Sequence, residues 1–106
     1  MIVFISGNIG RDNAAIKDVP LKNGTGSFQV GEASVAVKVS QDVSDWFGLK
    51  FRGDRLLKAS QYVAARSAFS GTGRLSFDHW ETPTQEQKTR PVINLTEVQL
   101  APKAKN

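Results

Sequence analysis

Residues 46–80, WFGLKFRGDRLLKASQYVAARSAFSGTGRLSFDHW, predict a strand, a helix and a second strand, and this order decides the fold class. Residues 46–52 alternate in polarity, and side chains on a strand switch face at every residue. The apolar face is predicted to pack on a core and consists of Phe47, Leu49 and Phe51. The opposite face meets solvent and consists of Trp46, Gly48, Lys50 and Arg52.

The pair Gly53-Asp54 ends this strand, and helical spacing follows from Leu56 to Ala64. Asp54 is the predicted N-cap of the helix, because a short carboxylate side chain can accept hydrogen bonds from the free amides of the first turn.

Residues 67–80 alternate again and predict the second strand. Its apolar face carries Phe69, Leu75 and Phe77, and its opposite face carries Arg74 and Trp80. Gly71 and Gly73 fall on the apolar face. A glycine inside a strand marks a bulge, a sharp bend or a close approach of another backbone. A strand that bends around a small barrel meets this description.

The rest of the chain supplies further strands and turns. In order, these are a strand over 2–5, a glycine-rich bend over 6–10, turns over 11–26, a strand over 28–40, a polar link over 41–45, an exposed hairpin loop over 81–90 and a strand over 91–100. In the strand over 28–40, Val35, Val37 and Val39 are predicted to point inward, which turns Lys38 outward.

The predicted fold is therefore all-β, with five strands and one helix between the third and fourth. A five-stranded OB-fold barrel places its helix at this point, as a plug at one end. A small sandwich with one crossover helix is the alternative. The barrel is expected to span residues 1–100, followed by a short basic tail over 101–106.

Composition narrows the function. The 106 residues suit a single domain, and 40% hydrophobic and 23% charged residues are ordinary for a globular chain. The absence of cysteine excludes disulfides, thiolate catalysis and cysteine-ligated metals, and His79 is the single histidine, so we expect no metal and no cofactor. The net charge of +4 is a mild bias toward polyanionic partners, although a solvated basic surface explains it equally well.

The sequence shows no sign of a membrane or export segment. No apolar stretch approaches the roughly 18 residues of a membrane span. The opening MIVFISGNIG lacks the basic start and the cleavage site of a signal peptide. We therefore expect a cytoplasmic protein with no membrane partner.

Catalysis finds little support. Asp78, His79 and Glu81 are close in sequence, but His79 faces away from Asp78 on a strand, so the three side chains cannot converge. No nucleophile and base pair is evident around the single histidine. We expect no enzyme activity.

Binding of single-stranded nucleic acid is better supported. Such sites combine aromatic side chains that stack on bases with basic residues that follow the phosphates. The outward rows and the loop after them supply both kinds: Trp46, Trp80, Lys38, Lys50, Arg52, Arg74, Lys88 and Arg90. Alternatively, an outward Trp lies in a subunit interface, and strand Lys and Arg residues protect sheet edges.

Several segments occur in the order and spacing of a known family. They are the opening IVFISGNIGRD, the Trp46 strand with Phe51 and Gly53, the segment Ala59-Ser60-Gln61-Tyr62, and Gly73-Arg74-Leu75 leading to Trp80. Together they resemble the bacterial single-stranded DNA-binding proteins, the SSB family. The resemblance covers nearly the whole chain apart from Arg11–Phe28.

The resemblance implies an OB fold, single-stranded DNA as partner, and a role in DNA replication, recombination or repair. It also implies a homo-oligomer, most often a tetramer and otherwise a dimer, and it places Trp46 and Trp80 where the family stacks bases. Arg52 stands where the family has a third stacking aromatic, and the hairpin over 41–45 is shorter than usual. These departures favour a second hypothesis, an OB-fold protein-interaction module similar to a primosome accessory subunit, with weak affinity for nucleic acid.

Overall fold

A computed structural model describes residues 1–21, 24 and 26–99. Within them lie six strands and one helix: β1 (Ile2–Ile9), β2 (Ala15–Pro20), β3 (Ser27–Ser40), β4 (Val43–Arg52), α1 (Asp54–Ser60), β5 (Ala68–Glu81) and β6 (Gln87–Gln99). The predicted basic tail over 101–106 lies outside the described residues. No helix in the described part of the chain is long and apolar enough to cross a membrane.

Five of the strands pair in a closed ring. Their order is β1-β5-β6-β4-β3, and β3 returns to β1 through the pairs Asn8↔Ala36 and Ile9↔Val35. Neighbours in the ring are antiparallel except β4 and β6, which are parallel. A closed ring of five strands is consistent with the predicted OB fold.

The sixth strand, β2, corrects the prediction of turns alone over 11–26. It pairs with the outer edge of β3 from Ala15↔Glu32 to Pro20↔Ser27. Pro20 cannot donate to a ladder, and proline is tolerated on an edge strand or at a strand end. This short strand has no covered face and therefore lacks the apolar alternation that revealed the others.

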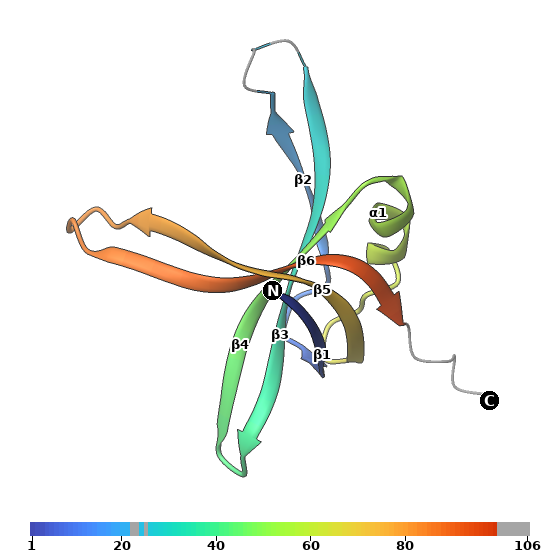
Figure 1. The fold of residues 1–106 in the computed structure, drawn as a ribbon, viewed down its shortest axis with the longest axis vertical. Helices are drawn as coiled ribbons and strands as arrows, with labels where there is room; N and C mark the ends of the chain where they lie inside the picture. The colour runs from blue at the N-terminus through green and yellow to red at the C-terminus, as the bar shows by residue number, and fades with distance from the viewer. Residues whose placement is uncertain (22–23, 25, 100–106) are drawn as a thin grey trace.

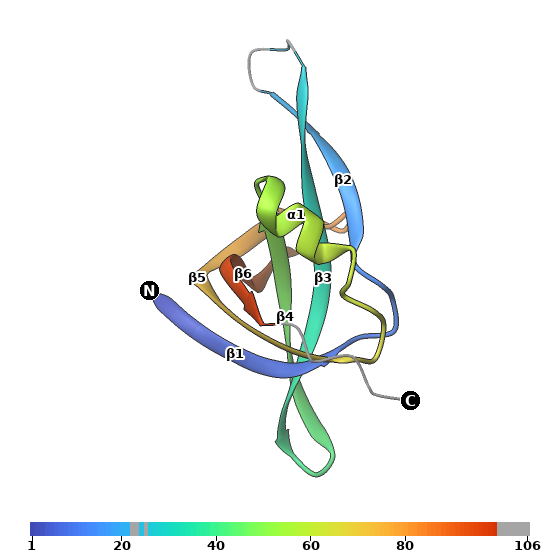
Figure 2. The same ribbon diagram turned by 90° about the vertical axis from the view of Figure 1, so that its right-hand side faces the viewer.

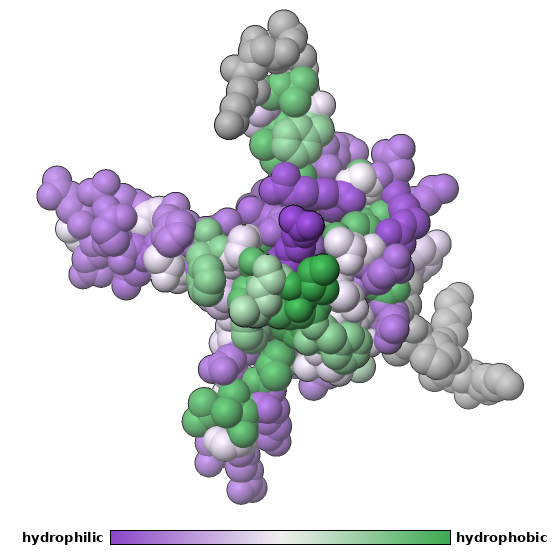
Figure 3. All heavy atoms as spheres, in the orientation of Figure 1, coloured by the Kyte–Doolittle hydropathy of each residue, from purple (hydrophilic) through white to green (hydrophobic). Residues whose placement is uncertain are grey.

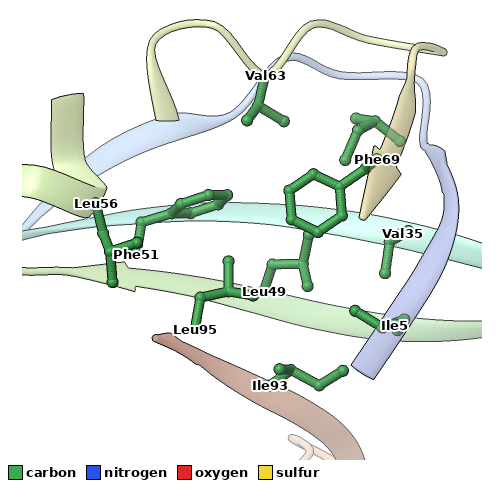
Figure 4. Close-up of a cluster of buried hydrophobic side chains, with 10 residues drawn as sticks. Ile5, Val35, Leu49, Phe51, Leu56, Val63, Phe69, Ile93 and Leu95 are labelled. Atoms are coloured by element: carbon green, nitrogen blue, oxygen red, sulfur yellow. The ribbon is translucent and has the colours of Figure 1, made fainter. Parts of the chain in front are cut away.

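The core fills the ring and matches the predicted inward rows. Figure 4 shows the side chains that meet there, which include Ile5, Val35, Leu49, Phe51, Leu56, Phe69, Ile93 and Leu95. Phe51 is fully buried, and its ring meets that of Phe69 edge to face with centroids 6.2 Å apart. Phe47 is partly buried against the same cluster, so the predicted apolar face of residues 46–52 is confirmed.

Helix α1 follows β4 directly and packs against β3, β4 and β6, with Leu56 buried in the core. The N-cap is Gly53, with φ of 86°, and not the predicted Asp54. A left-handed φ suits glycine, and it turns the chain sharply from strand into helix. The helix also ends at Ser60, earlier than predicted, because residues 61–67 continue as turns that bury Val63.

Three hairpins extend beyond the ring as arms, formed by β2–β3, β3–β4 and β5–β6 (Figure 1). The arms correct two predicted inward positions, because no core lies beneath them. Val39 is 61% exposed and Phe77 is 55% exposed. The predicted loop over 81–90 is also shorter, since β5 runs to Glu81 and β6 begins at Gln87. Lys88 and Arg90 therefore lie on a strand.

Strand β5 has a register shift against β6 between Thr72 and Gly73, within the stretch that also pairs with β1. A Cβ atom at Gly73 would collide with the carbonyl oxygen of Asn94 and lie 2.8 Å from Cγ2 of Ile93. The close backbone approach predicted for this strand is therefore present at Gly73.

Candidate nucleic-acid interface

The strand registers place the predicted outward residues on one continuous outer face. On β4, Lys50 lies opposite Glu32 of β3 and beside Asn94 of β6. Asn94 in turn lies opposite Arg74 of β5. Paired residues project to the same side of a sheet. The outward rows of β3, β4, β6 and β5 therefore form a single face, although they come from distant parts of the chain.

A groove of about 490 Å³ opens on this face beside Trp46. Arg90 and the loop Gly10–Asn13 also line it. A Cβ atom at Gly10 would lie 3.0 Å from Cζ3 of Trp46, so the indole ring rests against the Gly10 backbone. Trp46 is nevertheless 53% exposed. The ring is thus held on one side and open to a ligand on the other.

An ion-pair network joins two of the predicted basic residues. Nζ of Lys50 lies 3.3 Å from Oδ1 of Asp78, and Nη2 of Arg90 lies 3.9 Å from Oδ2 of the same carboxylate. The Lys50 side chain is only 19% exposed, whereas Arg90 is 43% exposed. The Asp78 carboxylate therefore neutralises part of the positive charge that Lys50 and Arg90 would otherwise present to a phosphate group.

The second tryptophan lies on the β5–β6 arm. Trp80 is opposite Lys88 and 46% exposed. Nζ of Lys88 lies 3.3 Å from Oε2 of Glu86, in a pair that is open to solvent. Such surface pairs stabilise by at most about 1 kcal/mol and yield readily to another anion. Trp80 and Lys88 thus form an aromatic and basic pair, and neither residue lines the groove.

Three other predicted residues are exposed on the outer face but do not line the groove. Lys38 lies opposite Ser44 near the tip of the β3–β4 arm, Arg52 lies opposite Val30, and Arg74 lies opposite Asn94. The predicted residues thus form a track across β3, β4, β6 and β5, and two of them, Trp46 and Arg90, line the groove.

The structure adds residues that the sequence analysis missed. Arg11 and Lys17 line the groove, but both are paired with carboxylates, at 3.8 Å from Asp12 and 3.0 Å from Glu32. Phe28 is 39% exposed and has the same strand parity as Lys38, so it shares the outer face. Counting outward positions back from Lys38 would have identified Phe28. Nothing in residues 11–17 signalled that they approach Trp46.

Among the described residues, no group of three or more His, Cys, Asp or Glu side chains is placed to hold a metal ion.

Comparisons with known proteins give a structural likeness without a sequence match. No protein-family model matches the chain, and no curated protein sequence is significantly similar to it. The fold is similar to that of the mitochondrial single-stranded DNA-binding protein Rim1 of S. cerevisiae, with a TM-score of 0.63 and 14% identity over 94% of this chain and 93% of that one. The chain has the fold of a single-stranded DNA-binding protein.

A second solved structure with this fold is the small single-stranded DNA-binding protein from Streptomyces coelicolor. It has a TM-score of 0.63 and 14% identity over 93% of this chain and 92% of that one. Both likenesses extend across nearly the full length of each chain. They therefore concern the whole ring and its arms, and not a shared hairpin.

Proposed function

We propose that this protein binds single-stranded DNA without sequence specificity and without catalysing a reaction, as a divergent member of the SSB family. The observation that carries the proposal is the outer face, where an exposed Trp46 lines a groove together with Arg90. The likeness to two single-stranded DNA-binding proteins supports it. Such proteins pair stacking platforms with a basic track, and this face contains both.

In the proposed mode, bases stack on Trp46 and Trp80, since every base has a π-face whatever its identity. The phosphates follow the basic residues of the track, which are Lys38, Lys50, Arg52, Arg74, Lys88 and Arg90. Each neutralised phosphate releases condensed counterions, so affinity falls as salt rises. Roles in DNA replication, recombination or repair follow from this activity.

We further propose that the protein is a homo-oligomer, a tetramer or otherwise a dimer. An apolar pocket of about 320 Å³ opens at the Phe47 end of the ring and is lined by Phe4, Val37 and Leu75 among others. Strand β1 borders it, and Phe4 is 62% exposed. Within the described residues, β1 pairs with β3 only at Asn8 and Ile9, so most of its second edge is open. Exposed apolar surface beside an open strand edge favours association.

The experiment that tests the proposal is a titration of tryptophan fluorescence with an unstructured oligothymidylate, at low and at physiological salt. Stacking on Trp46 or Trp80 should quench the emission strongly, and the apparent affinity should decrease with salt. A flat signal at low salt would contradict the proposal. The OB-fold protein-interaction module, whose partner is a protein, would then be the better hypothesis.

A further inference from the structure

The guanidinium group of Arg90 lies flat on the backbone of Gly48. A Cβ atom at Gly48 would be 3.1 Å from Cζ, 3.1 Å from Nη2 and 3.2 Å from Nε of Arg90. An edge-on approach would bring the two nitrogens clearly nearer than Cζ, so nearly equal distances mean that the Cβ position faces the plane. Because strand side chains stand perpendicular to the sheet, the guanidinium plane lies parallel to it.

The Arg90 side chain is also partly open to solvent. Arg90 lines the groove, and its side chain is 43% exposed. Oδ2 of Asp78 lies 3.9 Å from Nη2, so the two groups attract each other by charge at a distance too long for a hydrogen bond. Nε is buried and has no hydrogen-bond partner among the described residues. The Nε and Nη2 pair is thus unable to grip a phosphate, and a ligand in the groove meets the exposed remainder of the side chain.

The plane is also next to the indole ring of Trp46. Gly48 follows Trp46 by two residues on the same face of β4, which corresponds to a spacing of about 6.6 Å along the strand. Both groups line the groove. Two flat groups, one aromatic and one cationic, therefore lie side by side on the same strand face.

We infer that Arg90 stacks on a nucleobase, next to a base that stacks on Trp46. The backbone of Gly48 supports the guanidinium from below and holds it flat. This inference rests on the proposed function and changes the role of Arg90 within it from phosphate neutralisation to base stacking. A guanidinium plane stacks well on aromatic rings and adds a cation–π attraction. Arg90, and not Arg52, then replaces the third stacking aromatic that the chain lacks.

The test compares Arg90→Lys with the unmodified protein on two ligands of equal length, an oligothymidylate and an abasic oligonucleotide. Lysine keeps the charge but has no plane. We expect Arg90→Lys to bind oligothymidylate about threefold to tenfold more weakly, in line with the strength of cation–π contacts. Its affinity for the abasic strand should stay within twofold, because the phosphates are the same.

Two further variants distinguish an effect of the guanidinium plane of Arg90 from effects of its charge or of misfolding. Arg55→Lys is the matched control, since Arg55 is exposed on helix α1, outside the groove and outside the basic track, and it should bind both ligands within twofold of the unmodified protein. Gly48→Ala keeps Arg90 and its charge, but the added methyl group would lie 3.1 Å from Cζ, so the guanidinium must shift by a few tenths of an ångström. The three atoms nearest to that methyl group all belong to the end of a flexible side chain, so the variant should fold and should still weaken binding to oligothymidylate.

Equal loss by Arg90→Lys on both ligands would assign Arg90 to phosphates and overturn the inference. No loss on either ligand would overturn it as well. Both results leave single-strand binding by the unmodified protein intact. If the unmodified protein fails to bind oligothymidylate at low salt, the proposed function itself fails.

Discussion

Neutralising Asp78 should strengthen binding to single-stranded DNA. Its carboxylate lies 3.3 Å from the ammonium group of Lys50 and 3.9 Å from the guanidinium of Arg90. A phosphate that approaches Lys50 must share the cation with this carboxylate. The change Asp78→Asn keeps the size and shape of the side chain and removes only the charge.

The magnitude follows from the separation of the two anions. A phosphate oxygen about 3 Å beyond the Lys50 ammonium lies about 6 Å from Asp78, given ordinary hydrogen-bond lengths. Two unit charges at that distance repel by about 0.7 kcal/mol in the dielectric of water, and by more beside a protein surface. We therefore expect about threefold to tenfold tighter binding at low salt. The salt dependence should steepen by about 0.7 in the log–log slope, for one more neutralised phosphate.

The assay is the oligothymidylate titration at four or five salt concentrations. Glu81→Gln is the matched control, because Glu81 is also on β5 and shows no ion pair within the described residues. It removes the same charge without releasing a cation. Equal gains for the two variants would mean that net charge alone acts, and no gain for Asp78→Asn would refute the reasoning. Stability should change by less than about 1 kcal/mol, since the ion pair is partly exposed.

Three further expectations concern the aromatic residues, the register shift in β5 and the open edge of β1. Trp46→Ala and Trp80→Ala should each weaken oligothymidylate binding by about 1–3 kcal/mol per stacked base, with a small change in thermal unfolding because both residues are about half exposed; unchanged affinity would place that ring in an interface. Gly73→Ala should lower the free energy of unfolding by more than about 2 kcal/mol in urea titrations, because the methyl group collides with the Asn94 carbonyl. Gly48→Ala is the control and should unfold nearly like the unmodified protein. Phe4→Glu should reduce the molar mass measured by light scattering to that of a monomer, and an unaltered mass would exclude the β1 edge as the interface.

The local pattern of the sequence predicted much of the candidate interface. The outward positions of Trp46, Lys50 and Arg52 followed from alternation along a single strand, since the period of two is a property of the extended backbone itself. The same alternation gives the wrong result for Phe77 and Val39, which lie on the strand face that carries core residues but are exposed. Alternation predicts which side chains share a face, but not how far along the strand a core lies beneath that face.

Strand β2 shows a second limit. It has little apolar alternation, and its pairing with β3 supplies the evidence that it is a strand. An edge strand without a buried face gains its order from the ladder to its neighbour, and this information is not contained in its own residues.

The sequence by itself determined the inward and outward rows and the helix after Gly53, because each depends on neighbours in the chain. The tertiary structure decided which rows lie side by side. It placed the guanidinium of Arg90 on the backbone of Gly48, beside Trp46. It also brought Asp78 close enough to Lys50 to form an ion pair. The parallel pairing of β4 with β6 creates these contacts between residues far apart in sequence. Such a register is fixed by closure of the whole ring, a non-local condition that no local pattern encodes.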